Sequence, residues 1–548
     1  MRQGSNRRLA NVKTRRETGL DFIMQNMELG TPFGKKVLKE TKPYYPGEEQ
    51  ELIEELDRLE KMVGFVKDNQ ILVEKLEEVF MEMKDASLTL KRSESTILSM
   101  VELYEIKALL LQMRTILKLA KDGDKELIPQ EYILKDTEDI LDVLDPSGDR
   151  INTFYIYDEF SETLKNLRGK KREIELEIRR EQKQSRDELR RKHGVQLTPK
   201  FDIVVAKSHP DIDKIQALEE LEVADQDYMS ITFRLKATEA VYKLISDIEN
   251  INLEIEQEEE RIRGILSQKI AEHAAVLNEN CEKIGELDFA LAKAGYAVKH
   301  NLTKPEIVTE HIIEFTDGRN LQVESILRGK GKTYCPVSIS LKDGVTVITG
   351  ANMGGKTISL KLSGQVPILA QYGFFVPAAS AKIGLSNYMQ IIIGDSQSVE
   401  RGLSSFGSEM EELKEVFDRG QERSLILIDE IASGTNPSEG TALTRSIVDY
   451  LIQQPYISLI TTHFETVTEG EGVVNMQVRG LTGCDFSKLY REIKYAKRSE
   501  RINIISKYMD YRLYKVDDAK QVPKDALNIA AMLGIDSGII EGAKKYLK

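Results

Sequence analysis

An apolar run that leads directly into a glycine-rich segment constrains this chain more than any other feature. Val345–Thr349 is short and β-branched, and Gly-Ala-Asn-Met-Gly-Gly-Lys-Thr follows at 350–357. This is a complete GxxxxGK[ST] pattern, and a helix-forming segment begins at Ile358. A strand, a glycine-rich loop and a helix in this order are the context that the pattern requires, so the sequence predicts a P-loop on a parallel sheet.

The residue types in this loop suit the binding of a nucleoside triphosphate. Glycine allows backbone N–H groups to wrap around phosphates, and the start of the following helix adds positive potential. Lys356 can neutralise the β- and γ-phosphate oxygens, and the Thr357 hydroxyl can ligate Mg²⁺. ATP and Mg²⁺ are therefore the expected cofactors. The predicted nucleotide-binding residues of the loop are Gly350, Ala351, Asn352, Met353, Gly354, Gly355, Lys356 and Thr357.

Two further apolar runs end in polar residues that fit the same site. Ser424–Ile428 is followed by Asp429 and Glu430, and the next run ends in Thr-Thr-His at 461–463. Ligands of α/β sheets bind at the carboxyl ends of the strands, so these side chains are expected near the P-loop. Asp429 and Thr357 are the predicted metal ligands. The predicted catalytic residues are Glu430, which would polarise the attacking water, Lys356, and His463, which would sense the γ-phosphate.

The rest of the chain divides into a helical part and an α/β part. Residues 48–120 carry apolar side chains at helical spacing, whereas from about 317 short β-branched runs alternate with helices. The alternation predicts a mostly parallel, covered sheet. The predicted fold is thus multidomain, with an all-α core and a long antiparallel helical arm followed by an α/β P-loop ATPase domain.

The predicted arm rests on two complementary segments. Sixteen of the 23 residues at 170–192 are charged, and a helix so polar must project into solvent or pair along a thin seam. Residues 241–265 carry an apolar stripe with alternating three- and four-residue spacing, interrupted only by Glu258. Together they predict a helical arm, out and back, with a less regular tip at about 194–235. Two ordinary surface helices are the alternative.

Composition limits the remaining possibilities. The 548 residues carry a formal net charge of −13, which argues against a uniformly basic nucleic-acid coat. No run of 18 apolar residues occurs, and the N-terminus has no secretory h-region, so neither a membrane span nor a signal peptide is expected. Three scattered cysteines favour a reducing cytoplasm. The first 16 residues hold six Arg or Lys and no acid, which predicts either a solvated flexible terminus or a polyanion-seeking arm.

Several motifs together resemble the ATPase domain of the MutS family. They are TGANMGGKT at 349–357, FFVPAASAKIG at 374–384, LSSFGSEM at 403–410, LILIDEIASGTNPSEGTAL at 425–443 and ITTHF at 460–464. The resemblance covers about residues 20–548, and ALNIAAMLGIDSGIIEGAKKY at 526–546 is similar to the family's helical dimerisation tail.

The resemblance implies that the α/β domain is an ABC-type P-loop ATPase and that the protein is a dimeric clamp. MutS proteins are homo- or heterodimers with two composite ATPase sites, and by analogy Ser404 of the other subunit would contact the γ-phosphate bound by residues 350–357. The Ser433–Thr435 turn would face the same interface. ATP binding would close the dimer and move the helical levers, and hydrolysis would reset them.

Departures from the family pattern affect the expected biology. Core-like helices begin within about 50 residues of Met1, which leaves no room for the N-terminal domains whose Phe-x-Glu wedge recognises mismatches, and no Smr-like domain is expected after the ATPase. The loop has Ala351 where the family usually has Pro. The predicted tip holds at least as many acids as bases, which makes it a poor duplex clamp.

The expected function is therefore a Mg-ATP-driven dimeric switch that binds branched or otherwise structured DNA. A protein-remodelling factor, such as a reactivating partner of a cobalamin-dependent aminomutase, is the alternative. The expected domains are a basic arm and lead-in at 1–40, a helical core at 41–168, the lever arm at 169–285, a return to the core at 286–316, the ATPase at 317–510 and a helical dimerisation segment at 511–548.

Overall fold

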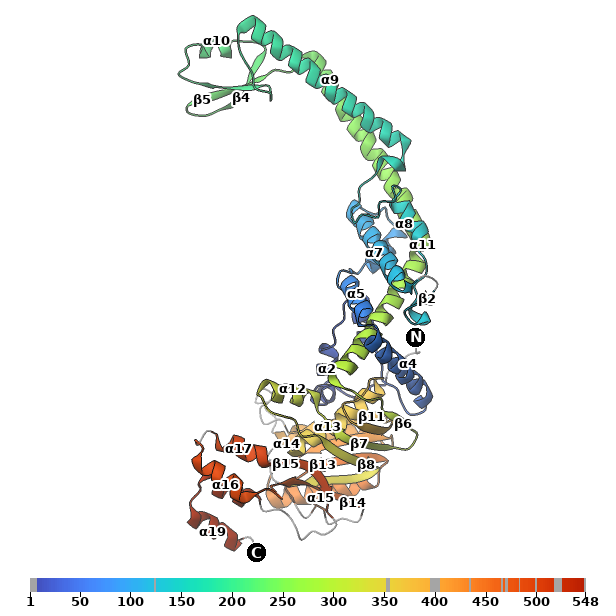
Figure 1. Ribbon diagram of the computed structural model, residues 1–548, viewed down its shortest axis with the longest axis vertical. Coiled ribbons are helices and arrows are strands. Elements are labelled where there is room, and N and C mark those ends of the chain that lie inside the picture. Colours follow the sequence, from blue (N-terminus) through green and yellow to red (C-terminus); the bar gives the residue numbers. More distant parts are fainter. Residues whose placement is uncertain are drawn as a thin grey trace. The chain divides into compact units, whose positions relative to one another are not determined.

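The computed structural model divides the chain into two compact units (Figure 1). It describes residues 7–122, 125–350, 355–394, 405–432, 435–464, 467–468, 472–481, 483–497, 500–516 and 525–546. The sheet unit consists of Met1–Gly30, Gly34–Glu77 and Gly285–Lys548, and the helical unit consists of Thr31–Phe33 and Glu78–Ile284. Within the described residues, no helix is long and apolar enough to cross a membrane.

A six-stranded sheet forms the centre of the sheet unit, with strand order β11-β12-β13-β9-β14-β15. The strands are β11 (Tyr388–Ile393), β12 (Ser424–Asp429), β13 (Tyr456–Thr461), β9 (Gly344–Thr349), β14 (Val473–Gly480) and β15 (Asp510–Lys515). The first five are parallel, and only β15 runs antiparallel. All six residues of β13 are buried, as expected for a parallel strand that is covered on both faces.

Helices between these strands cover the sheet. They are α13 (Gly355–Gln371), which contacts β12 and β13, α14 (Ser405–Asp418), which contacts β11, and α15 (Pro437–Ile452), which contacts β9. This arrangement confirms the α/β character expected of the region. Because β12, β13 and β9 are in register, Asp429 pairs with Thr461 and Thr461 pairs with Ile348. The carboxyl ends of the three strands therefore meet at one edge of the sheet.

A smaller sheet and a C-terminal group of helices complete this part of the unit. The sheet has the order β6-β10-β7-β8, with β6 at Glu306–Val308, β7 at Ile312–Gly318, β8 at Val337–Lys342 and β10 at Ser380–Gly384. A Cβ atom at Gly384 would lie 1.8 Å from the carbonyl oxygen of Glu310, so only glycine fits there. Helices in this part of the unit include α12 (Leu321–Gly329) and the C-terminal group α16 (Phe486–Tyr495), α17 (Arg501–Tyr508), α18 (Asp525–Leu533) and α19 (Ser537–Tyr546).

The N-terminal segment packs against the edge of the large sheet. Ala10 forms a parallel bridge with Met389 of β11, and the Met389 N–H donates to the Leu9 carbonyl at 2.7 Å. Two short helices follow, α1 (Val12–Glu17) and α2 (Leu20–Gln25). Leu9, Leu20 and Ile23 are at most 1% exposed. From residue 7 onward the segment thus differs from a solvated flexible terminus, because Leu9, Leu20 and Ile23 are buried.

Further helices follow α2 along the chain. They are α3 (Pro32–Glu40), α4 (Glu49–Asp68), α5 (Gln70–Met81), α6 (Ser87–Ser93), α7 (Met100–Leu119) and α8 (Glu138–Leu144). In α7, buried Leu103, Ile106, Leu110 and Met113 follow the helical spacing expected from the sequence. A capping box between Ser99 and Glu102 fixes the start of this helix. A short hairpin pairs β1 (Lys121–Asp122) with β2 (Lys125–Glu126).

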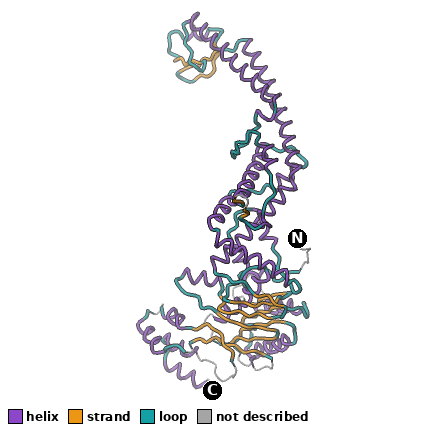
Figure 2. Tube along the Cα trace, turned by 45° about the vertical axis from the view of Figure 1, so that its right-hand side comes forward, coloured by secondary structure: helices purple, strands orange, loops and turns teal. Residues whose placement is uncertain are grey.

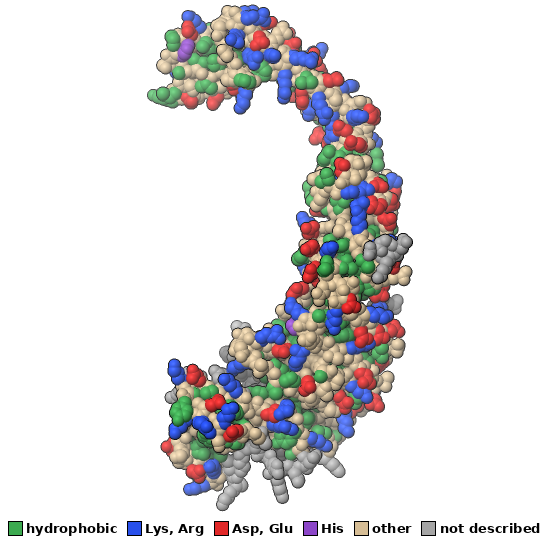
Figure 3. All heavy atoms as spheres, viewed as in Figure 1, with side chains coloured by type: hydrophobic (Ala, Val, Ile, Leu, Met, Phe, Trp, Pro, Cys, Tyr) green, Lys and Arg blue, Asp and Glu red, His purple; other side chains and the backbone are tan. Residues whose placement is uncertain are grey.

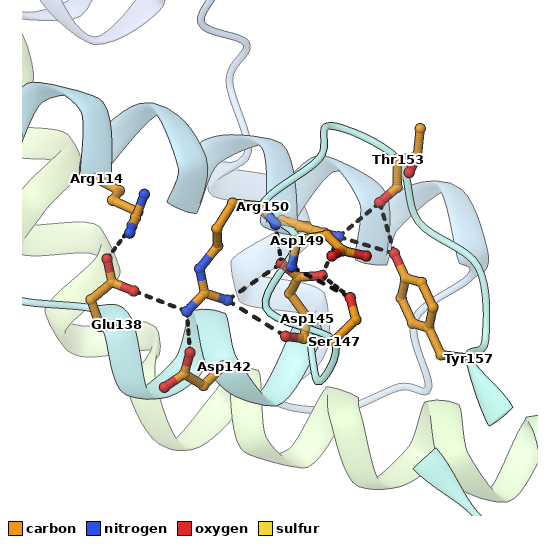
Figure 4. Close-up of polar contacts among 10 residues, drawn as sticks. Arg114, Glu138, Asp142, Asp145, Ser147, Asp149, Arg150, Thr153 and Tyr157 are labelled. Atoms are coloured by element: carbon orange, nitrogen blue, oxygen red, sulfur yellow. Dashed lines mark hydrogen bonds and ion pairs between the residues drawn. The ribbon is translucent and has the colours of Figure 1, made fainter. Parts of the chain in front are cut away.

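A buried polar cluster fixes the loop between α8 and the next helix (Figure 4). The ammonium group of Lys107, on α7, donates to Asp145 Oδ1 at 3.0 Å, to the Thr153 carbonyl at 2.9 Å and to the Tyr157 hydroxyl at 3.0 Å. The Lys107 and Asp145 side chains are each 1% exposed. Arg150 extends the cluster through hydrogen bonds to Asp145. Every Lys107 donor is therefore satisfied, as a buried ammonium requires.

The helical unit contains one long helix and the part of a second one up to Ile284, and together they carry a small β module. Helices α9 (Glu162–His193) and α11 (Glu239–His300) run side by side (Figures 1 and 2). Between them lie β3 (Asp202–Ala206), α10 (Ile212–Gln216), β4 (Leu221–Gln226) and β5 (Ser230–Leu235), with antiparallel strand order β3-β5-β4. This module, here called the tip, has its own core around Phe233, Ile231 and Leu221. It is more regular than the sequence suggested.

Candidate functional site

The site is assembled where β9, β12 and β13 end. Of the predicted phosphate loop, the structure describes Gly350, Gly355, Lys356 and Thr357, whereas Ala351, Asn352, Met353 and Gly354 lie outside the described residues. Gly350 directly follows β9 with φ +123°, a backbone conformation that favours glycine. Helix α13 begins at Gly355, so Lys356 and Thr357 occupy its first turn.

Lys356 is a buried cation, and its neighbouring carboxylates only partly offset the unfavourable effect of burial on its charge. The residue is 3% exposed, and its ammonium group lies 3.4 Å from Glu430 Oε1 and 3.4 Å from each ring nitrogen of His463. Burial lowers the pKa of Lys356 more than the neighbouring Glu430 and Asp429 carboxylates raise it. A multiply charged anion near the ammonium group would stabilise its protonated form. Lys356 therefore fits the role of a phosphate-binding residue.

The Thr357 hydroxyl and the Asp429 carboxylate form a compact set of oxygen donors. Thr357 Oγ1 donates to Asp429 Oδ2 at 2.8 Å, and Thr461 Oγ1 donates to the other carboxylate oxygen. Mg²⁺ prefers oxygen ligands and is commonly held by one or two protein groups together with phosphate oxygens. Groups of three or more His, Cys, Asp or Glu suited to a metal are absent from the described residues. Thr357 and Asp429 therefore fit a magnesium ion that also needs a phosphate ligand.

Glu430 is held in an uncommon backbone conformation. Its φ is +51°, and that of Ala432 is +57°, so two non-glycine residues within three positions have left-handed backbone. The Glu430 N–H donates to the Thr461 carbonyl at 3.0 Å, and Glu430 Oε1 lies 2.8 Å from His463 Nε2. Strained backbone persists where surrounding contacts determine it, and it clusters at functional sites. The turn thus presents the Glu430 carboxylate to His463 and Lys356.

Glu409 supports this turn and was not among the predicted residues. It lies on α14 and is 5% exposed, and its Oε2 accepts the Ala432 N–H at 3.0 Å. Burial raises the pKa of Glu409, while the Ala432 hydrogen bond opposes the shift. One sequence signal could have identified it. Glu409, Leu413 and Val416 share one buried helix face, and a carboxylate at such a position needs a specific partner.

The structure therefore brings together Lys356, Thr357, Asp429, Glu430 and His463 from three separate segments of the chain. Other predicted residues are not placed. Ser404 lies outside the described residues, as do Ser433 and Gly434 of the turn expected at a subunit interface. Their proposed contacts with a second subunit stay predictions.

Part of the chain matches a known protein family. Residues 346–548 match the family described as MutS domain V, which includes every site residue named above. A protein named Endonuclease MutS2 from Agathobacter rectalis is 33% identical over 313 residues, covering 56% of this chain and 36% of the relative. Another of that name from Caldanaerobacter subterraneus subsp. tengcongensis is 27% identical over 457 residues, covering 82% of this chain and 52% of the relative.

The chain spans between about a third and a half of the length of the curated relatives it matches. The alignment with the Caldanaerobacter protein extends well beyond the matched domain, into the helical part of the chain. The family match and the names of the relatives agree with the motifs and with the geometry at the ends of β9, β12 and β13. Residues 346–548 are therefore similar to domain V of the MutS family.

Proposed function

We propose that the chain is a Mg²⁺-dependent ATPase that uses nucleotide hydrolysis to switch its conformation on DNA. The convergence of Lys356, the Thr357–Asp429 pair and the Glu430–His463 pair at one edge of the sheet carries this proposal. Phosphate-binding, metal-binding and water-orienting groups are the parts that phosphoryl transfer to water needs.

Each side chain has a distinct role in the proposed reaction. Lys356 binds the β- and γ-phosphate oxygens, and the Thr357 hydroxyl and Asp429 carboxylate hold the metal. When bound, Mg²⁺ neutralises charge on the phosphates. Glu430 accepts a hydrogen bond from the attacking water and polarises it. His463, 2.8 Å from Glu430 Oε1, keeps that carboxylate in place and faces the γ-phosphate.

The switch and its assembly extend this proposal. A second copy, or a related subunit, would supply Ser404 to the γ-phosphate, so ATP binding would close the dimer and hydrolysis would reopen it. DNA is the proposed target because residues 346–548 match MutS domain V and the relatives are named Endonuclease MutS2. Branched or otherwise structured duplexes are the proposed ligands.

One observation favours a protein client as the second candidate. Between residues 194 and 236, eight Asp or Glu side chains outnumber five Lys or Arg side chains. In the same module, Tyr228 and Met229 are 94% and 73% exposed, and Figure 3 shows hydrophobic side chains on its surface. A net acidic module with exposed apolar side chains suits a protein partner better than a phosphate backbone. Remodelling of an inactivated enzyme is the corresponding function.

Two substitutions test the catalytic assignment. We expect Lys356→Ala to abolish ATP turnover by removing the phosphate contact, and Glu430→Gln to abolish it while nucleotide binding persists. Turnover is measured by steady-state phosphate release and binding by fluorescent nucleotide titration. Exposed Lys67 and Glu422 provide the controls Lys67→Ala and Glu422→Gln, which should retain wild-type turnover. Normal hydrolysis in either site variant would refute the assignment.

Stimulation of hydrolysis distinguishes the two targets. The ATPase rate is measured with linear, mismatched and four-way DNA at low salt, and with any protein that copurifies with the tagged chain. An increase with a DNA structure supports the proposed function, and an increase only with the protein supports the second candidate. A rate insensitive to all DNA, together with no ATP-sensitive gel shift, counts against action on DNA.

A further inference from the structure

A second concave site in the sheet unit is lined by positive side chains. A cavity of about 870 Å³ is bordered by parts of the N-terminal segment, by residues 41–43 and by Tyr372. We call it the basic pocket. Its charged lining consists of Arg7, Arg8, Lys13, Arg15, Arg16 and Lys42, and its lining contains no carboxylate side chain. It shares no residue with the candidate nucleotide site.

The folded N-terminal segment fixes the positions of these cations. Leu9 and Ala10 are buried at the sheet edge, and they lie directly after Arg8 in the chain. The Asn11 side chain caps α1 and also donates to Gln390 at 3.1 Å. Tyr372, buried at 7% exposure, forms another part of the lining. The pocket therefore combines a packed apolar base with cations whose backbone is held in place.

The charge of the pocket is only partly balanced by protein. Lys13 pairs with Glu412 at 2.6 Å, Arg15 with Asp21 at 2.6 Å and Arg16 with Glu17 at 3.1 Å. Those three carboxylates lie outside the lining of the pocket.

Two of the pocket cations are exposed and have no such partner. Among the residues that the structure describes, Arg8 and Lys42 make no ion pair, and both are exposed. An adjoining cavity of about 420 Å³ shares Arg8 and Asn11 with the basic pocket, and its lining includes Glu415 and Asp418.

We propose that the basic pocket binds a chain of phosphate groups. Four of its six cations are arginines, whose planar guanidinium groups match phosphate oxygens in pairs. A single carboxylate would neutralise little of this charge, whereas linked phosphates supply several negative charges within the volume of the cavity. The phosphates belong either to a nucleic-acid backbone or to a free oligophosphate, and both present the same oxygens.

Charge reversal of the two unpaired cations tests the proposal. The assay uses the full chain carrying Lys356→Ala, which weakens phosphate binding at the nucleotide site. Binding of a fluorescein-labelled 30-nucleotide single strand is followed by anisotropy at several salt concentrations, with inorganic tripolyphosphate as competitor. The test variant adds Arg8→Glu and Lys42→Glu. The control adds Lys61→Glu and Lys67→Glu on α4, which are exposed and give the same change in net charge.

We expect the Kd of the test variant to rise at least about tenfold at low salt. The slope of log Kd against log salt concentration should fall by about 0.7 for each phosphate that the variant no longer neutralises. The control should differ from its parent by less than about twofold. If tripolyphosphate displaces the labelled strand from the parent chain, a free oligophosphate is identified as ligand. If the test variant loses strand binding but tripolyphosphate does not displace the strand from the parent chain, a nucleic-acid backbone is identified as ligand. Equal affinities in test and control variants, at unchanged melting temperature, would overturn the proposal. Substitution by Gln at both positions repeats the test if the Glu variant melts early.

Discussion

At the scale of single residues, Lys107 shows how a buried charge fixes a loop. Its ammonium group holds Asp145, Thr153 and Tyr157, which follow one another over 13 positions with little regular structure. Burial alone would raise the pKa of Asp145, but hydrogen bonds from Lys107 and from the Arg150 N–H lower it below its usual value. The ionised carboxylate is therefore the form that stabilises this loop.

Removal of this cation tests the point. We expect Lys107→Met to lower the free energy of unfolding by about 3 kcal/mol, because a buried carboxylate loses its main partner. Because the folded pKa of Asp145 is depressed, its contribution is present above the unfolded pKa and is lost as pH falls through the folded value. In the variant that pKa rises, so the loss should begin at higher pH.

Denaturant unfolding between pH 3 and 7 measures both effects. The control is Lys118→Met, which changes an exposed lysine on the same helix and should alter stability by less than about 0.5 kcal/mol. Equal stability of the two variants at pH 7 would show that the Lys107 contacts contribute nothing net.

The residues of the candidate site illustrate what local pattern can predict. Lys356, Asp429 and His463 each follow an apolar strand, and parallel strands align their ends, so their proximity follows from sequence order alone. The positive φ of Glu430 and the hydrogen bond between Glu409 and Ala432 do not follow from sequence order. Both depend on packing between α14 and the turn after β12. The spacing of residues within either segment does not predict that these two segments are in contact.

At the scale of elements, Glu258 explains an interruption in the apolar stripe of α11. Its carboxylate accepts the Ser161 hydroxyl at 2.6 Å and pairs with Arg261 at 2.6 Å. Ser161 is the N-cap of α9, so the acid joins the start of one long helix to the side of the other. Arg168 of α9 pairs with the adjacent Glu259 at 2.7 Å. Over the paired parts of α9 and α11, Figure 3 shows charged side chains of both signs.

Hydrogen bonds from Arg261 and Ser161 lower the pKa of Glu258 to about 2. We expect Glu258→Gln to reduce stability by about 1 kcal/mol near neutral pH, since a charge-assisted contact becomes neutral. The folded pKa is depressed, so this difference should be present above pH 4.5 and disappear as pH falls toward about 2. Glu254→Gln, on an exposed position one turn earlier, is the control.

Thermal unfolding at pH 6 and pH 3 provides the measurement. A gap between Glu258→Gln and wild type that stays constant between these two pH values would contradict the assignment of the shift to this carboxylate.

In the tip, the spacing of apolar residues in the sequence does not predict the secondary structure. The α9 and α11 segments have a strong helical pattern and long uninterrupted spans, so their helical state follows from the sequence. The tip consists of strands of five or six residues around a small core, and its polar outer positions hide the alternation. Strand pairing between β3 and β5 joins residues about 30 positions apart, and that register depends on tertiary contacts.

At the scale of the whole molecule, the N-terminal segment packs against the edge of the large sheet, whose strands come much later in the sequence. Thr14 Oγ1 accepts the Ile391 N–H at 3.2 Å, and the Gln365 side chain donates to the Thr18 carbonyl at 3.0 Å. These partners are separated by nearly 350 residues or more, so no sequence pattern predicts them. The pairing covers the exposed edge of β11, which would otherwise leave unpaired backbone groups.

Two truncations test whether this segment is part of the folded sheet unit. Deletion of residues 1–18 should lower its free energy of unfolding by at least about 3 kcal/mol, because buried N–H groups at Met389 and Ile391 lose their acceptors and Leu9 its burial. Deletion of residues 1–6 removes none of the contacts named here and should leave stability near wild type. Guanidinium unfolding followed by far-UV circular dichroism measures both. Equal stability of the two truncated chains would mean that the edge of β11 folds without its N-terminal strand, and the basic pocket would then have no fixed wall.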